Sequence, residues 1–187
     1  MTSVDAFNAI DGDAAAAMLH PCCASTAWAR AVVAGRPYAD LAALIAASDP
    51  IVAGLGWADV EEALAAHPRI GDRPKVAATT EKRWSQGEQA GVADADQAIL
   101  AGLADGNQAY EARFGHVYLV FASGKSAEEL LGILQDRLDH DPAHERDVVR
   151  AELAAITRLR LTKLFPTEAS GEKASGEKAS AKEEVHP

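Results

Sequence analysis

Apolar residues recur at steps of three and four in segment after segment of this chain, which places them on one face of an α-helix. The longest such stripe lies near the C-terminal end and contains Val149, Leu153, Ile156 and Leu164. Alanine and leucine are abundant while β-branched and aromatic residues are sparse, so intrinsic propensity also favours helices. The pattern predicts an all-α fold, a single-domain bundle of about eight helices packed on one another.

The helical pattern ends near Phe165, where the composition changes. A chain of 187 residues with 48% hydrophobic content is the size of one domain with its own core, which we assign to residues 1–165. Residues 166–187 repeat Ala-Ser-Gly-Glu-Lys with almost no apolar side chains, so burial cannot offset the entropy of ordering them. We expect this tail to be disordered and assign it no catalytic role.

Prolines and glycines are expected to divide the helical pattern. Pro21 and Pro50 lack the backbone N–H that a helix interior needs, so we expect each to break a helix. Gly102 and Gly106 are expected to interrupt or soften a long helix that ends near Phe114.

Two segments between the helices are expected to be ordered without being helical. Residues 67–74 contain two prolines that bracket a glycine, which predicts a rigid loop. Residues 116–122 alone have strand composition, and no partner strand is evident. We therefore expect a buried extended link that crosses the core.

Charge and cysteine content limit the classes of partner. A net charge of −10 argues against binding a nucleic-acid backbone. No stretch approaches the roughly 18 apolar residues needed to span a bilayer, and no leader pattern opens the chain, so we expect no membrane partner. Cys22 and Cys23 are adjacent, which disfavours a disulfide and fits a cytoplasmic location. They are either reactive thiols or small buried hydrophobes.

His67 is a polar residue on an apolar helix face. It follows Val60 by seven positions and Leu64 by three, which places it on the buried face at a helix end. An imidazole there can exchange protons near neutral pH. The alternative is a core or capping histidine satisfied by a backbone carbonyl.

Ser85 and Glu88 share one helical face beside Trp84. A carboxylate next to an indole is partly desolvated, which raises its pKa and makes it a better proton carrier or hydrogen-bond acceptor. Most glutamates on short helices are simply solvated, so that alternative stays open.

Arg160 falls within the apolar stripe of the last helix, four residues after Ile156. A guanidinium at such a position needs an anion. It extends to solvent, pairs with a buried acid, or binds the carboxylate of a small ligand.

Other chemistry has weaker support. His140 and His144 superficially resemble a metal spacing, but Asp141-Pro142 starts a helix, so the two imidazoles need not share a face. No glycine-rich phosphate loop or nucleophile elbow occurs. We expect no metal site.

The sequence resembles the family of 2-oxo-4-hydroxy-4-carboxy-5-ureidoimidazoline (OHCU) decarboxylases in the order and spacing of its elements. The elements that carry the resemblance are Cys22-Cys23-Ala24-Ser25 with Trp28, His67-Pro68-Arg69-Ile70-Gly71, Ser85-Gln86-Gly87-Glu88-Gln89, residues 107–115, residues 117–125, Arg137-Leu138 and residues 156–164. A single short element would be weak support, but these are spread over one domain and are jointly specific.

The resemblance implies an all-helical enzyme of urate breakdown that decarboxylates OHCU to (S)-allantoin without metal or cofactor. By match to the family's motifs, the catalytic residues are His67, Glu88 and Arg160. The positions that match substrate contacts are Pro68, Ser85, Gln89, Leu119, Val120 and Phe121. Relatives are often homodimers, so we expect a possible homodimer.

Departures from the commoner family pattern are Ile70 for leucine, His116 for an apolar residue and His140 where asparagine is frequent. None touches the expected proton carriers.

Two other functions stay open: a helical interaction module without turnover, and a lyase or hydrolase for another ureido acid.

Overall fold

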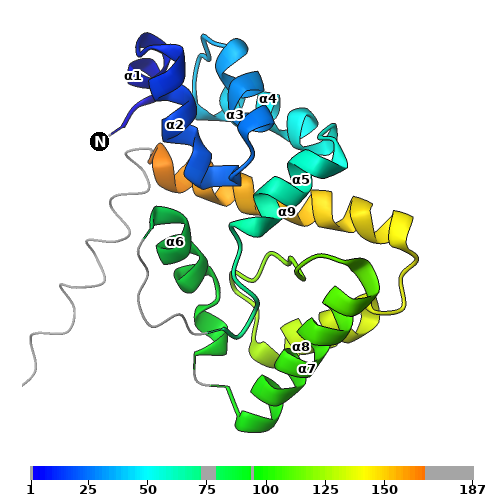
Figure 1. Ribbon diagram of the computed structural model, residues 1–187. Coiled ribbons are helices and arrows are strands. Elements are labelled where there is room, and N and C mark those ends of the chain that lie inside the picture. The colour runs from blue at the N-terminus through cyan, green and yellow to red at the C-terminus, as the bar shows by residue number, and fades with distance from the viewer. Residues whose placement is uncertain (1, 73–78, 94, 167–187) are drawn as a thin grey trace, which may run out of the picture.

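The computed structural model describes residues 2–72, 79–93 and 95–166, and these contain nine α-helices, one 3-10 helix and no strand. The helices in Figure 1 are α1 (Val4–Ala9), α2 (Gly12–Cys23), α3 (Thr26–Ala34), α4 (Leu41–Ala53), α5 (Trp57–Ala65), α6 (Thr80–Glu88), η1 (Ala90–Val92), α7 (Gln97–Phe114), α8 (Ala127–Arg137) and α9 (Pro142–Leu164). The all-α prediction is confirmed. Except for Pro166, the predicted disordered tail lies outside the described residues.

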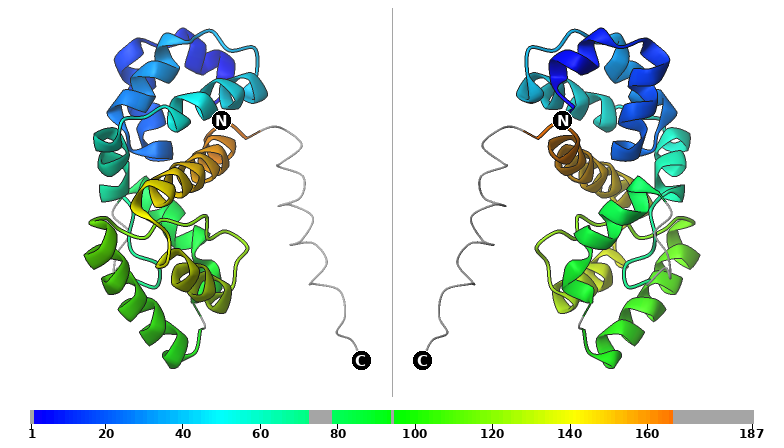
Figure 2. Two further views of the ribbon diagram at one scale, coloured as in Figure 1. Left: turned by 90° about the vertical axis from the view of Figure 1, so that its right-hand side faces the viewer. Right: turned by 90° about the vertical axis from the view of Figure 1, so that its left-hand side faces the viewer.

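The long helix α9 runs between two groups of helices (Figures 1 and 2). Helices α1 to α5 lie on one side, where α9 packs against α2 and α4, and helices α6 to α8 lie on the other, where α7 packs against α8. Each group has its own hydrophobic cluster. The predicted bundle is therefore built around one central helix.

The predicted buried link crosses between these two clusters. Residues 117–122 form neither helix nor strand, and Tyr118 and Val120 belong to the cluster of α7 and α8, whereas Leu119 belongs to the cluster of α1 to α5 and α9. Alternate side chains of an extended chain point in opposite directions, which explains this division. The prediction is confirmed, and the link joins the two halves of the core.

Most helices begin at side-chain caps. Ser3, Asp11, Ser25, Thr79 and Asp141 each accept a hydrogen bond from a backbone N–H in the first turn that follows. Ser126 and Glu129 form a capping box at the start of α8. These caps satisfy N–H groups that the helix leaves without partners, which is why the helix starts could be predicted locally.

The prediction that Pro21 and Pro50 break helices is wrong. Both lie inside helices, Pro21 in α2 and Pro50 in α4. Each stands in the last turn, where only a few hydrogen bonds follow it, and the residues after it are buried: Cys22 and Cys23 in α2 and Val52 in α4. Packing of these last turns outweighs the loss of one backbone hydrogen bond.

The prediction that Gly102 and Gly106 interrupt α7 is also wrong. The helix is continuous, and the two glycines face α8. A Cβ at Gly102 would come within 3.0 Å of the Leu131 side chain, and one at Gly106 within 2.6 Å of the Leu134 side chain. The glycines therefore allow close helix packing rather than a break.

No single described helix is long and apolar enough to cross a bilayer, although α4 and α5, bent by 112°, meet that test as a pair by length and composition.

Candidate active site

A small cavity lies where the loop after α5, helix α6, the link and α9 meet. Its volume is about 20 Å³. The lining residues are His67, Pro68, Ile70, Ser85, Glu88, Gln89, Tyr118, Leu119, Val120, Phe121, Ala122 and Ile156. Every site residue predicted from the sequence lines this cavity except Arg160, which contacts Glu88 and Ser85 directly. Residues distant in the sequence thus converge as expected.

His67 presents one ring nitrogen that has no partner. Nδ1 lies 2.9 Å from the carbonyl oxygen of Ala63, and a carbonyl can only accept, so the neutral ring is protonated at Nδ1. Nε2 is buried and has no hydrogen-bond partner among the described residues. A backbone carbonyl therefore satisfies Nδ1, as one of the two interpretations predicted, and Nε2 keeps a lone pair for a ligand. The exchange of protons by His67 stays a prediction.

The surroundings keep His67 uncharged. Burial of the imidazole and, after it, the positive charge of Arg160 lower its pKa to about 4, outweighing the opposite effects of the Ala63 carbonyl and Glu88. A histidine with this pKa is neutral at physiological pH and can accept a proton at Nε2.

Arg160 pairs with a buried acid, which was one of the alternatives left open by the sequence. Its Nε donates to Glu88 Oε1 over 3.2 Å and its Nη2 to Glu88 Oε2 over 2.9 Å. Nη2 also donates to Ser85 Oγ over 2.9 Å. The exposed fractions of the two side chains are 1% for Arg160 and 8% for Glu88, so Glu88 is not the solvated glutamate of the alternative interpretation.

Lys163 is a site residue that sequence reasoning missed. Its Nζ donates to Glu88 Oε1 over 2.9 Å, and 34% of its side chain is exposed. Burial acts to raise the pKa of Glu88, but the hydrogen bonds and charges of Arg160 and Lys163 outweigh it, so the pKa is lowered. Glu88 is therefore an anion. The available signal was the spacing, because Lys163 lies one turn after Arg160 on the same helix.

Side chains hold the backbone of the link in place of a neighbouring strand. Arg137 Nη1 donates to the carbonyl oxygen of Leu119 over 2.7 Å. The N–H of Phe121 donates to Glu152 Oε2 over 2.7 Å, and its carbonyl accepts from Lys125 Nζ over 2.7 Å. These anchors fix the wall of the cavity.

The anchors also limit which backbone groups of the link can meet a ligand. The Leu119 carbonyl and both backbone groups of Phe121 are occupied, whereas the N–H and carbonyl of Val120 have no hydrogen-bond partner within the described ranges. The N–H of Leu119 also has no hydrogen-bond partner within the described ranges, so the backbone groups of residues 119–121 that remain for a ligand are this N–H and the two groups of Val120.

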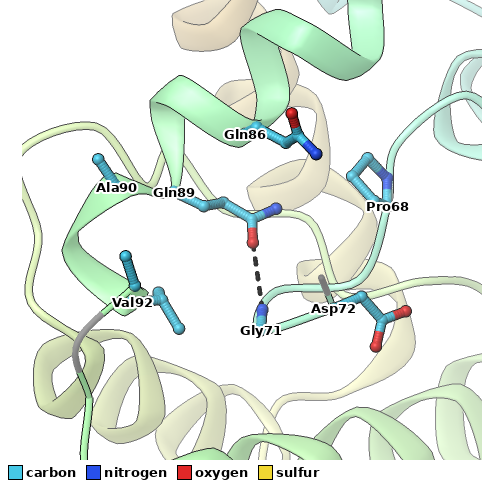
Figure 3. A pocket seen from close by; sticks show the side chains of 8 residues that line it. Pro68, Gly71, Asp72, Gln86, Gln89, Ala90 and Val92 are labelled. Carbon is cyan, nitrogen blue, oxygen red and sulfur yellow. Dashed lines mark hydrogen bonds between the residues drawn. The ribbon is translucent and has the colours of Figure 1, made fainter. Parts of the chain in front are cut away.

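A second, larger pocket adjoins the cavity (Figure 3). It measures about 340 Å³ and shares Pro68 and Gln89 with the cavity. Gln89 Oε1 accepts a hydrogen bond of 3.1 Å from the N–H of Gly71, as Figure 3 shows. The smaller cavity is the candidate active site because His67 and Glu88 line it, and the larger pocket provides adjoining space for a ligand.

Two other groups of reactive side chains do not line the candidate cavity. Burial raises the pKa of Cys22 and of Cys23 to about 12, so both are protonated, buried thiols. The ring of His140 packs on His144, and its Nδ1 lies 2.7 Å from Glu145 Oε2. In the part of the chain that the structure describes, no three His, Cys, Asp or Glu side chains form a metal-binding group.

A family model and two relatives among known proteins indicate the same family. A family model described as OHCU decarboxylase matches residues 8–162. The chain is 33% identical over 144 residues to the 2-oxo-4-hydroxy-4-carboxy-5-ureidoimidazoline decarboxylase of Amia calva, covering 76% of this chain and 82% of that protein. It is 31% identical over 150 residues to the uric acid degradation bifunctional protein TTL of Arabidopsis thaliana, covering 79% of this chain. The match spans 46% of that relative's length, about half.

Solved structures agree with this result. A crystal structure of OHCU decarboxylase in the presence of (S)-allantoin superposes with a TM-score of 0.69 at 26% identity, covering 84% of this chain and all of that one. A crystal structure of (S)-allantoin synthase superposes with a TM-score of 0.66 at 20% identity, covering 89% of this chain and 55% of that one, and supports the fold alone. The family predicted from the sequence is confirmed.

Proposed function

Because the chain belongs to the OHCU decarboxylase family, we propose that it is a carboxy-lyase that converts OHCU to (S)-allantoin in urate breakdown. The observation that carries this proposal is the unpartnered Nε2 of a neutral His67, which lines the same buried cavity as Glu88. A helical interaction module would have no need for a buried base without a partner.

The substrate supplies its own electron sink. Loss of carbon dioxide leaves an electron pair that the adjacent ring imine accepts, with one proton from solvent added at its nitrogen. The resulting enol becomes the amide-type ring carbonyl of allantoin when the hydroxyl loses its proton and the neighbouring ring carbon gains one. The protein needs to orient the substrate and move this proton, and no organic cofactor is required for the electrons.

The neutral imidazole fits that proton transfer. Nε2 of His67 accepts the hydroxyl proton, and the imidazolium can return it to the neighbouring carbon from one face, which sets the (S) configuration. Glu88 and Ser85 accept and donate hydrogen bonds to the ureido or ring nitrogens, with the free backbone groups of Val120, while Arg160 attracts the carboxylate. Pro68 and Gln89 form the wall toward the larger pocket.

The direct test supplies OHCU by passing urate through urate oxidase and hydroxyisourate hydrolase, then follows allantoin by circular dichroism. The proposal predicts rapid appearance of one enantiomer with the wild-type protein. His67→Ala should slow it by about a hundredfold to ten-thousandfold, the usual contribution of a general acid or base. Spontaneous rates with folded wild-type protein would support the interaction module, and a product other than allantoin would support the other ureido-acid enzyme.

We further propose that the protein is cytoplasmic and forms a homodimer. The buried, unbridged Cys22 and Cys23 are compatible with a reducing compartment. Light scattering after size exclusion tests the dimer, since a mass of 19.6 kDa at all concentrations would contradict it.

A further inference from the structure

The hydrogen bonds of Arg160 leave little capacity for a ligand. A guanidinium has five N–H donors. One on Nε and both on Nη2 go to Glu88 and Ser85, and Nη1 donates to the carbonyl of Pro21 over 3.4 Å. One N–H of Nη1 is left without a partner among the described residues, so a carboxylate that binds Arg160 through two hydrogen bonds must also displace one of these partners, and Glu88 holds two of the four contacts.

Glu88 has a second cation that permits such an exchange. Lys163 approaches Glu88 Oε1, the oxygen that also accepts from Arg160 Nε. With 34% of its side chain exposed, Lys163 has room to follow the carboxylate, whereas Arg160 is enclosed at 1% exposure. Glu88 would keep a counter-ion while Arg160 turns to another anion.

The charges in contact with one another do not cancel. Arg160 and Lys163 carry two positive charges, Glu88 carries one negative charge, and His67 is neutral. Solvent stabilises the positive charge of Arg160 little at 1% exposure, so an anion that enters beside it would balance the surplus. The cluster is therefore suited to a ligand with one carboxylate.

We propose that Lys163 is a positioning and specificity-determining residue, which holds Glu88 when Arg160 binds the substrate carboxylate and so makes the site selective for anions. This inference rests on the proposed function, because the anion it accounts for is the carboxylate of OHCU. Lys163 acts through Glu88 and Arg160 and need not touch the reacting atoms.

The test compares one anionic and one neutral ligand. Isothermal titration measures the affinity of the full-length chain for allantoate, a ureido carboxylate, and for (S)-allantoin, which has no carboxylate. The variants are Lys163→Gln, which removes the charge, and Lys163→Arg, which keeps it. Lys82→Gln is the matched control, because it removes a lysine charge from an exposed position of α6, the helix that carries Glu88.

Lys163→Gln should weaken allantoate binding by about fivefold, the effect of a partly exposed ion pair, and leave (S)-allantoin binding unchanged. KM for OHCU should rise in parallel, while kcat changes less. Lys163→Arg should restore both values, and Lys82→Gln should match the wild type. Equal losses for both ligands, or no loss for either, would overturn the proposal.

The two proposals fail in different ways. A wild-type protein that does not accelerate allantoin formation contradicts the proposed function, whatever Lys163 does. A wild-type protein that is active, with Lys163→Gln unchanged in allantoate affinity and KM, contradicts the role of Lys163 alone.

Discussion

Helix α9 carries one member of each of two buried arginine–glutamate pairs. Near its start, Glu145 pairs with Arg137 of α8, with exposed fractions of 0% and 4%. About four turns further on, Arg160 pairs with Glu88 of α6, and this pair is also buried. By residue type and burial the two pairs are alike, yet only the second adjoins the proposed active site.

The difference lies in the neighbours of each pair. Glu145 Oε1 accepts from Arg137 and from the hydroxyl of Tyr110, and Oε2 lies against the ring of His140. Arg137 Nη1 also donates a hydrogen bond to the carbonyl oxygen of Leu119. The hydrogen-bond partners of Glu145 and Arg137 are thus groups of the protein itself. The cluster holds the link in place as one wall of the cavity.

The Glu88–Arg160 pair has a different setting. It adjoins a cavity, an imidazole nitrogen without a partner and a half-exposed lysine. A buried ion pair is therefore weak support for function by itself, and a neighbouring polar atom that lacks a partner is stronger support.

The largest expected effect is a loss of unfolding free energy when the Glu145–Arg137 pair is broken. Glu145→Gln leaves Arg137 buried without a countercharge, so the free energy of unfolding should fall by about 3–5 kcal/mol in urea titrations. Turnover per folded molecule should change far less than for variants of Glu88. An unchanged urea midpoint would contradict the structural role of this pair.

The stability loss should depend on pH. Burial acts to raise the pKa of Glu145, but Arg137, Tyr110 and His140 outweigh it, so the folded pKa lies below the ordinary value of 4.5. The stabilisation is therefore full above pH 4.5 and is lost as the pH falls through the lowered folded pKa. Wild type and Glu145→Gln should converge in acid.

The next largest effect is a loss of kcat/KM when the Glu88–Arg160 pair is changed. Glu88→Gln keeps the size of the side chain but removes the anion, and kcat/KM should fall on the order of a hundredfold. Its loss of unfolding free energy should be smaller than that of Glu145→Gln, because Lys163 is half-exposed and the cavity admits water or an anion. If Glu88→Gln lost more unfolding free energy than Glu145→Gln and kept the wild-type kcat/KM per folded molecule, the assignment of the two pairs to stability and catalysis would be reversed.

A smaller effect is expected at Tyr110. Tyr110→Phe removes one hydrogen bond to Glu145 while Arg137 still satisfies that oxygen, so unfolding should become easier by about 1 kcal/mol. Allantoin formation should stay at the wild-type rate. Tyr118→Phe is the control, because the Tyr118 hydroxyl makes only a 3.3 Å hydrogen bond to the carbonyl of Leu130.

The smallest effect is expected at an exposed pair on the same helix. Arg158 of α9 donates to Asp49 over 2.7 Å, and 53% of the Arg158 side chain is exposed. Asp49→Asn should cost less than about 1 kcal/mol and leave turnover unchanged. A loss as large as that of Glu145→Gln would show that burial does not separate these pairs.

Local signals were enough to predict most of the fold. Caps such as Ser3, Ser25 and the Ser126 capping box depend on residues within one turn. The apolar stripe of α9 showed Arg160 as a charged residue among apolar ones. Gly102 and Gly106 were misinterpreted because their role depends on leucines of another helix, which no local pattern shows.

The site could be predicted less completely. The resemblance supplied His67, Glu88 and Arg160, but the contact of Lys163 with Glu88 joins residues 75 positions apart. The roles of Arg137 and Glu152 likewise depend on where the link runs. The spacing from Arg160 places Lys163 on the same side of α9, but the partners of Lys163, Arg137 and Glu152 follow from tertiary packing.

The central claim is that His67 is a neutral base with a free Nε2. Long-range proton–nitrogen NMR of the nitrogen-15-labelled protein measures this directly, with His67→Asn used to assign the signal. The structure predicts a ring protonated at Nδ1 that titrates near pH 4. A ring protonated at Nε2, or a titration near the ordinary value of 6.5, would contradict the account.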